Sequence, residues 1–310
     1  MRNSFLRASG NEIARLSPPT SASDALHSTS LSRRKGQTRR LRQALIKIND
    51  LFDGDYVEPY CGGAAVALEL LFHEYVSRVH INDISKPVHA FWKSILYHTE
   101  KLCRLIRDTP LTVRAWDKQK LIFSNASDFS SLELGFATFF LNRTNRSGVL
   151  NAGVIGGRDQ AGPWKIDARF NRKELVFRVE SIARMRERIR LTRMDAIRFL
   201  RAKAGEWTAK TLIYLDPPYY EKGRDLYYDF YEPRDHEQIH QLLTGAFKAM
   251  RWIISYDNVE PIRKLYKGQQ RLVYAVAYSA RRARQGREVM FFSDAVQKSP
   301  LTGPLKFVKS

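Results

Sequence analysis

The stretch DYVEPYCGGAAVALELLF, residues 55–72, contains the unit on which the predicted fold is built. Its first residues predict a short strand, Gly62 and Gly63 predict a turn, and the apolar run from about Ala64 predicts a helix. Glycines at such a turn let a ligand approach the backbone, and the start of the helix offers free N–H groups. Glycines needed only for close packing would explain the turn equally well.

The same order of strand and helix recurs along the chain. Repeated alternation favours an α/β fold with a parallel sheet and helices on both faces. The last two apolar runs, residues 271–280 and 287–294, predict a hairpin. Further strands are predicted at residues 79–81, 189–192, 211–215 and 252–257, and helices at residues 38–52, 235–250 and 259–268.

The middle of the chain interrupts this alternation. It contains FFLNRTNRSGVLNAGVIGGRDQAGPWKIDARFNRKEL, which is dense in Asn, Arg and Gly and predicts an inserted subdomain with long polar loops. Residues 17–34 are rich in Ser, Thr and Pro, and their composition is typical of a poorly ordered segment. We therefore expect an N-terminal segment at 1–37, a catalytic domain at 38–99 and 179–310, and an insertion at 100–178.

The amino-acid composition indicates which classes of partner the chain is expected to bind. The 310 residues include 52 Lys and Arg against 32 Asp and Glu, and a net charge of +20 favours a polyanionic partner such as nucleic acid over a merely basic surface. The two cysteines, Cys61 and Cys103, lack metal-ligand spacing, so we expect no metal and a reducing, cytoplasmic compartment. The chain shows neither an apolar signal region nor a run that could cross a membrane, so no membrane partner is expected.

Two acidic residues, one before the glycine turn and one well after it in the sequence, bear on the kind of ligand expected there. Asp83 follows Gly63 by 20 residues, which is the spacing at which a carboxylate accepts hydrogen bonds from ribose hydroxyls. The pattern is not G-x-G-x-x-G, which counts against a dinucleotide. Glu58 would repel a pyrophosphate, and it therefore favours a cofactor with a cationic end.

The sequence DPPY, residues 216–219, lies directly after the apolar strand TLIYL. Pro217 and Pro218 have fixed φ angles and hold the corner rigid, Asp216 supplies an acceptor, and Tyr219 supplies a flat stacking face. Two acceptors beside an aromatic ring suit a planar group with an exocyclic amine, such as a nucleobase, and would make that amine a better nucleophile. An ordinary turn in which Asp216 caps a helix would explain the same residues.

Together these motifs resemble the N6-adenine DNA methyltransferases of the alpha group, the Dam type. Four further stretches are similar to elements of that family in the same order, and the resemblance covers about residues 50–295. They are HINDISKPV (80–88), FFLNRTNRSGVLNAG (139–153), RMDAIRFL (193–200) and EVMFFSD (288–294).

The resemblance implies an α/β, Rossmann-like methyltransferase domain that uses S-adenosylmethionine and carries a target-recognition insertion made mainly of helices and loops. Tyr60, Gly62 and Ala64 would line the methionine end of this cofactor, Asp83 would bind its ribose, and Asp195 its adenine. A methyl group would pass directly to N6 of a flipped adenine, with no metal and no covalent intermediate. The implied cofactor-binding residues are Glu58, Tyr60, Gly62, Gly63, Ala64, Asp83, Asp195 and Asp216, and the implied catalytic residues are Asp216, Pro217, Pro218 and Tyr219.

The resemblance also implies that the insertion recognises its target in double-stranded DNA. Arg and Asn side chains suit paired hydrogen bonds with guanine and adenine, although each arginine could equally be a solvated surface charge. A restriction nuclease paired with the enzyme would be a separate chain. The residues implied to contact DNA are Asn142, Arg143, Asn145, Arg146 and Asn151.

One departure from the family leaves two explanations open. The family's Gly-Gly-Lys element before the EPY strand is absent, and Lys35-Gly36 is its nearest counterpart. Either the element has diverged, or the N-terminus was altered by a reading-frame lesion, which would leave a DNA-binding remnant with little activity. The motifs are also compatible with an RNA adenine methyltransferase or with an N4-cytosine methyltransferase, although N4-cytosine enzymes more often have Ser at the position of Asp216.

Overall fold

The computed structural model describes residues 45–221, 231–278, 284–297 and 307–308. The predictions for residues 1–37, including the Lys35-Gly36 element, lie outside these residues. Of the helix predicted at residues 38–52, the described part is helical over residues 45–48.

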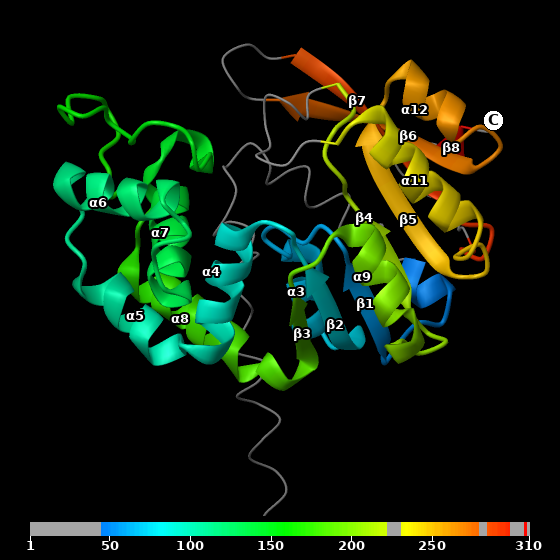
Figure 1. The fold of residues 1–310 in the computed structure, drawn as a ribbon, viewed down its shortest axis with the longest axis horizontal. Helices are drawn as coiled ribbons and strands as arrows, with labels where there is room; N and C mark the ends of the chain where they lie inside the picture. The colour runs from blue at the N-terminus through cyan, green and yellow to red at the C-terminus, as the bar shows by residue number, and fades with distance from the viewer. Residues whose placement is uncertain (1–44, 222–230, 279–283, 298–306, 309–310) are drawn as a thin grey trace, which may run out of the picture.

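One mixed sheet of eight strands forms the centre of the molecule, in the order β3-β2-β1-β4-β5-β7-β6-β8 (Figure 1). The strands from β3 to β5 pair in parallel, and β7 enters antiparallel between β5 and β6. The predicted parallel α/β sheet and C-terminal hairpin are thus confirmed. The strands are β1 (Gly54–Glu58), β2 (Val76–Asn82), β3 (Ile189–Thr192), β4 (Leu212–Leu215), β5 (Arg251–Asp257), β6 (Gln270–Tyr278), β7 (Arg284–Phe292) and β8 (Phe307–Val308).

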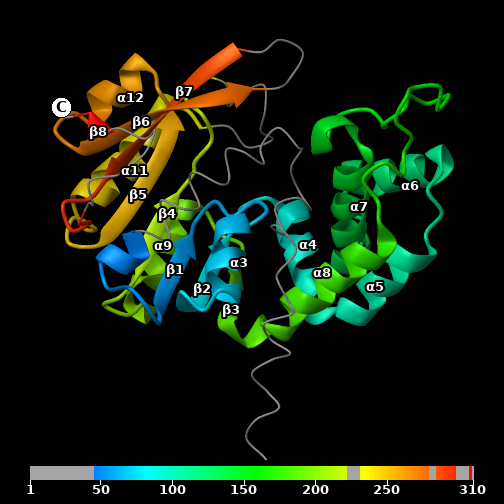
Figure 2. The ribbon, with the colours of Figure 1, turned by 180° about the vertical axis from the view of Figure 1, so that it is seen from behind.

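Helices cover both faces of this sheet. Successive residues of a strand point to opposite sides, and here both sides carry apolar side chains that need to be buried. Tyr56 is buried in one core and its neighbour Val57 in the other, and the view from behind shows the second face (Figure 2). Strand order reverses between β1 and β4, and the crevice at the carboxyl ends there is where α/β sheets bind ligands. The helices are α3 (Ala65–Phe72), α4 (Lys86–Tyr97), α5 (Thr99–Asp108), α6 (Val113–Ser124), α7 (Ser131–Thr144), α8 (Arg172–Arg184), α9 (Ala196–Lys203), α11 (Pro233–Thr244) and α12 (Glu260–Leu265).

One prediction about the helices needs correction. The helix predicted to run to Met250 ends at Thr244, because Gly245 leaves the helical conformation (φ −97°, ψ −101°).

The middle region consists mainly of helices and a loop, as expected. The helices α5, α6 and α7 account for most of residues 99–144, and a long polar loop follows at about residues 145–171.

The helices α5 to α8 form a lobe beside the sheet, and α4 connects the two (Figure 1). The contact between α4 and α7 is close because α7 carries Gly135 there. A Cβ atom at this position would lie 2.2 Å from Ser94 Oγ and 2.4 Å from the Ala90 carbonyl oxygen. Glycine therefore lets the helical lobe pack directly against the helix that follows β2.

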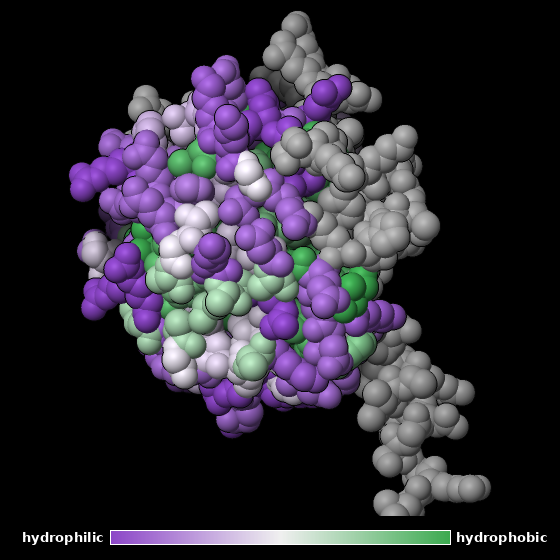
Figure 3. All heavy atoms as spheres, turned by 90° about the vertical axis from the view of Figure 1, so that its right-hand side faces the viewer, coloured by the Kyte–Doolittle hydropathy of each residue, from purple (hydrophilic) through white to green (hydrophobic). Residues whose placement is uncertain are grey.

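The opposite side of the molecule is mostly hydrophilic. Figure 3 views the face where α11 and α12 lie, and apolar residues appear there only in small separate areas. Within the described parts of the chain, no helix combines the length and apolar sequence that crossing a membrane requires.

Replacement of Gly135 by alanine is expected to lower the free energy of unfolding by about 1–3 kcal/mol, because the added methyl group overlaps α4. Equilibrium urea unfolding measures the change. Gly205→Ala is the matched control, since a Cβ atom at Gly205 would meet no atom within 4 Å. Equal stability of the two variants would contradict the packing argument.

Candidate active site at the carboxyl ends of the strands

A buried amide joins the carboxyl ends of three strands. The Asn82 side chain, which is 0% exposed, donates hydrogen bonds to the carbonyls of Pro59 (3.0 Å) and Met194 (2.9 Å). Its oxygen accepts from Thr192 Oγ1 (2.9 Å) and the Met194 backbone N–H (3.0 Å). Both donors and the acceptor oxygen are satisfied, so the segments that follow β1, β2 and β3 are held side by side.

The glycine turn and Asp83 are in direct contact. The Gly62 N–H donates to Asp83 Oδ2 (2.9 Å), and the Gly62 carbonyl accepts from Trp92 Nε1 (2.8 Å). Gly62 has φ +45°, a conformation that favours glycine, and a Cβ atom there would meet nothing within 4 Å. Asp83 Oδ1 also accepts from the Ser85 N–H (3.0 Å), so its carboxylate is fixed at the end of β2. Ala64 has φ +43° and turns the chain into α3.

Negative charge gathers at this turn. Glu58, the last residue of β1, is buried, and Asp83 lies on the other side of Cys61 in the chain. Burial raises the pKa of the Cys61 thiol well above its usual range, and the charges of Asp83 and Glu58 raise it further. Among the described residues, no cluster of His, Cys, Asp and Glu could hold a metal ion.

Tyr60 and Asp195 lie at the ends of neighbouring segments. Asp195 caps α9 by accepting a hydrogen bond from the Arg198 N–H (2.9 Å), and its side chain is exposed. The Tyr60 hydroxyl pairs with the Tyr231 hydroxyl (2.8 Å). Burial, Tyr231 and the charge of Asp195 together raise the pKa of Tyr60, so this hydroxyl stays neutral.

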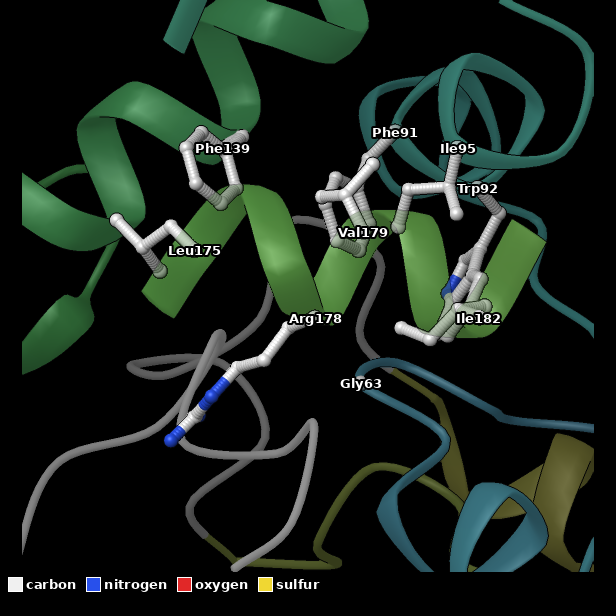
Figure 4. A pocket seen from close by; sticks show the side chains of 9 residues that line it. All are labelled: Gly63, Phe91, Trp92, Ile95, Phe139, Leu175, Arg178, Val179 and Ile182. Carbon is white, nitrogen blue, oxygen red and sulfur yellow. The ribbon is translucent and has the colours of Figure 1, made fainter. Parts of the chain in front are cut away.

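Gly63 closes the turn against an apolar wall. A cavity of about 10 Å³ lies beside it, which is room for roughly one water molecule. Figure 4 shows the side chains of α4, α7 and α8 that form the wall, with Arg178 pointing away from them. The cavity is lined by Gly63, Phe91, Trp92, Ile95, Phe139, Leu175, Arg178, Val179 and Ile182.

The DPPY loop begins next to the glycine turn, because β4 pairs with β1. Asp216 is exposed, and its Oδ1 accepts a hydrogen bond from Ser255 Oγ (2.6 Å). Ser255 in turn pairs with the Tyr214 hydroxyl (2.7 Å). Pro217 is buried and Pro218 half-buried, so the corner packs onto the sheet, while Asp216 remains exposed at its start.

Two further acids support the same loop. Asp257 accepts hydrogen bonds from the N–H groups of Tyr220 (3.0 Å) and Glu221 (3.2 Å). Glu288 accepts one from the Tyr219 hydroxyl (2.7 Å). We call Ser255, Asp257 and Glu288 the loop cradle; the first two lie on β5 and the third on the adjacent β7. Reasoning from the sequence missed all three, although a polar residue within or beside the apolar run of a strand is a signal that could have indicated them.

A buried histidine contacts the chain on both sides of residues 222–230. The His236 ring lies 5.1 Å from the Tyr220 ring and 5.5 Å from the Tyr231 ring, measured between centroids. Its Nδ1 pairs with the Tyr256 hydroxyl (3.1 Å). Burial lowers the pKa of His236 to about 4, so the ring is neutral near pH 7.

The residues implied to contact DNA separate into two groups. Asn142 and Asn145 are buried, and their amides donate to backbone carbonyls of Gly148 in the first case and of Val149 and Leu150 in the second, each at 2.9 Å. These two amides shape the loop of the insertion from within.

The other residues of that set lie further out. Arg143 is half-buried and donates through Nε to the Arg169 carbonyl (2.8 Å). Arg169, which no sequence pattern had indicated, donates to the carbonyls of Asn142 and Asn145 and thus helps to hold the loop. Arg146 and Asn151 are exposed and are the members of the set that face solvent. In Figure 1 this loop and the loop after β4 both lie in the upper part of the molecule.

Comparison with known proteins agrees with this geometry. A family model described as "D12 class N6 adenine-specific DNA methyltransferase" matches residues 42–280. The curated proteins contain no significant match to the chain. Because the model spans well over half of the chain, and because the sheet has the Rossmann-like form expected of a methyltransferase, the chain belongs to the D12 class N6 adenine-specific DNA methyltransferases.

Proposed function

We propose that the chain transfers a methyl group from S-adenosylmethionine to N6 of an adenine flipped out of duplex DNA, as an enzyme of the alpha, Dam-type group. One observation carries the proposal most directly. Asp216 is exposed at the end of β4, next to β1, whose end carries the glycine turn, and Asp83 at the end of β2 is bonded to that turn. A base amine held by Asp216 would thus be beside the ligand held by the turn.

The residues at the turn fit this cofactor. When bound, S-adenosylmethionine supplies a methyl group on a positively charged sulfur. Glu58 and Asp83 provide negative charge beside Cys61, which raises the pKa of its thiol and would favour a cationic ligand. Open space at Gly62 would let the ligand approach the backbone. Asp83 would bind the ribose hydroxyls and Asp195 the adenine amine.

The DPPY loop would act on the target base. Asp216 would accept hydrogen bonds from the adenine amine, which increases the nucleophilic character of N6. The Pro217 carbonyl would be the second acceptor, and the Tyr219 ring would stack on the base. Ser255 already fixes one oxygen of Asp216, so the carboxylate need not reorganise when the base arrives.

The insertion would contact the DNA. A net charge of +20 favours binding to phosphates, and the exposed Arg146 and Asn151 are the strongest candidates for base contacts in the predicted set. Asn142, Arg143 and Asn145 would contribute by holding the loop in shape.

Asp216→Ala is expected to reduce methyl transfer at least about 100-fold, because it removes the acceptor for the base amine. Incorporation of radiolabelled methyl groups into unmethylated plasmid measures the rate. Asp108→Ala, at an exposed acid that ends α5, is the control and should retain the wild-type rate. Incorporation that survives Asp216→Ala would contradict the pocket assignment, and an inactive wild type would support a catalytically impaired remnant.

Asp83→Asn is expected to weaken binding of S-adenosylmethionine about 10-fold or more, since it removes a charged acceptor from both the Gly62 N–H and the ribose. Isothermal titration calorimetry measures the dissociation constant. Asp128→Asn makes the same chemical change at an exposed position in the insertion and should leave the affinity unaltered. Unchanged affinity in Asp83→Asn would exclude Asp83 from the cofactor site.

A further inference from the structure

Glu288 places a carboxylate between two tyrosine hydroxyls. It lies on β7 and is 8% exposed. Its Oε1 accepts from the Tyr219 hydroxyl (2.7 Å) and its Oε2 from the Tyr274 hydroxyl (2.6 Å). A carboxylate taken out of water is tolerated only where hydrogen bonds compensate it, and charge-assisted O–H donors provide the strong form of that bond.

The sheet fixes one side of this arrangement. Tyr274 and Glu288 are partners in the pairing of β6 and β7, so both backbones are held by the sheet. Burial and the charge of Glu288 raise the pKa of Tyr274, and its hydroxyl therefore remains a donor near neutral pH. With Tyr274 bonded to Oε2, the carboxylate has a defined orientation that directs Oε1 toward Tyr219.

The rest of the DPPY loop is held by other groups. Ser255 binds the side chain of Asp216, and Asp257 binds the backbone of Tyr220 and Glu221. These contacts fix the chain before and after Tyr219 without fixing the Tyr219 ring. Glu288 is the member of the loop cradle that bonds to the ring's hydroxyl, so its removal would change the ring's orientation while the loop backbone stays in place.

We propose that Glu288 is a positioning residue, which holds the Tyr219 ring in the plane where it stacks on the flipped adenine. The inference rests on the proposed function. It assigns Glu288 no contact with the substrate: Glu288 acts through the Tyr219 hydroxyl, and the ring acts on the base.

The kinetic consequence is specific. A misaligned ring would disturb the base only after it has left the helix, so the loss would appear in kcat while the affinity for S-adenosylmethionine is retained. Glu288→Gln keeps the size of the side chain but replaces the carboxylate with a neutral amide that has one acceptor oxygen, which weakens the bond from the Tyr219 hydroxyl, and we expect kcat to fall about 10-fold. Tyr219→Phe keeps the ring and removes this hydrogen bond completely, so it tests the contact even if Glu288→Gln folds poorly.

The test is a double-mutant cycle in the full-length chain, with methyl transfer to unmethylated plasmid as the activity. If Glu288 acts through the Tyr219 hydroxyl, Glu288→Gln combined with Tyr219→Phe will be no slower than the slower single variant. If the fold losses in kcat of the two single variants multiply in the double variant, the proposal is overturned. Glu288→Gln combined with Asp108→Ala is the control pair, and its effects should be independent.

A second measurement does not depend on activity. 3-Fluorotyrosine placed at position 219 gives a ¹⁹F NMR signal that reports the surroundings of the ring. We expect Glu288→Gln to shift or broaden this signal, and Asp108→Ala to leave it unchanged. An unchanged signal in Glu288→Gln would overturn the proposal. A changed signal in a protein whose wild type transfers no methyl group would instead overturn the proposed function, and with it the catalytic meaning of the contact.

Discussion

The hydrogen bonds of one buried amide hold the candidate active site together. Asn82, at the end of β2, bonds to Pro59 after β1 and to Thr192 and Met194 at the end of β3, so three segments of the chain meet at its side chain. The residues that follow Pro59, Asn82 and Met194 in the sequence are Tyr60, Asp83 and Asp195, which are the residues proposed to surround the cofactor. Because a buried amide with an unsatisfied donor or acceptor is costly, the three segments cannot separate without breaking several hydrogen bonds at once.

A second set of contacts holds the DPPY loop from the other side of the site. Ser255 and Asp257 lie on β5 and Glu288 on β7, so the loop rests on the antiparallel part of the sheet while it begins at the end of a parallel strand. The site is therefore built where two kinds of strand pairing meet. The parallel strands position the glycine turn. The antiparallel strands position the loop whose groups are proposed to act on the base.

Local patterns in the sequence predicted much of this. The strands and the glycine turn follow from short-range signals, because each depends on residues close together in the sequence. The cradle could not be predicted in the same way, since Glu288 and Tyr219 are 69 residues apart. Asn142 and Asn145 belong to a stretch whose many Asn and Arg residues suggested contacts with DNA. In the fold, their amides bond to backbone carbonyls of the same loop. This contact depends on the three-dimensional path of the chain, so the sequence alone did not reveal it.

His236 joins the two sides of the candidate site through tyrosine rings. Its ring contacts Tyr220, which follows the DPPY sequence, and Tyr231, which precedes α11. The Tyr231 hydroxyl in turn pairs with the Tyr60 hydroxyl, next to the glycine turn (2.8 Å). A series of aromatic side chains thus runs from the segment after β1 to the segment after β4, so a shift at one of these segments can be transmitted to the other through packed rings.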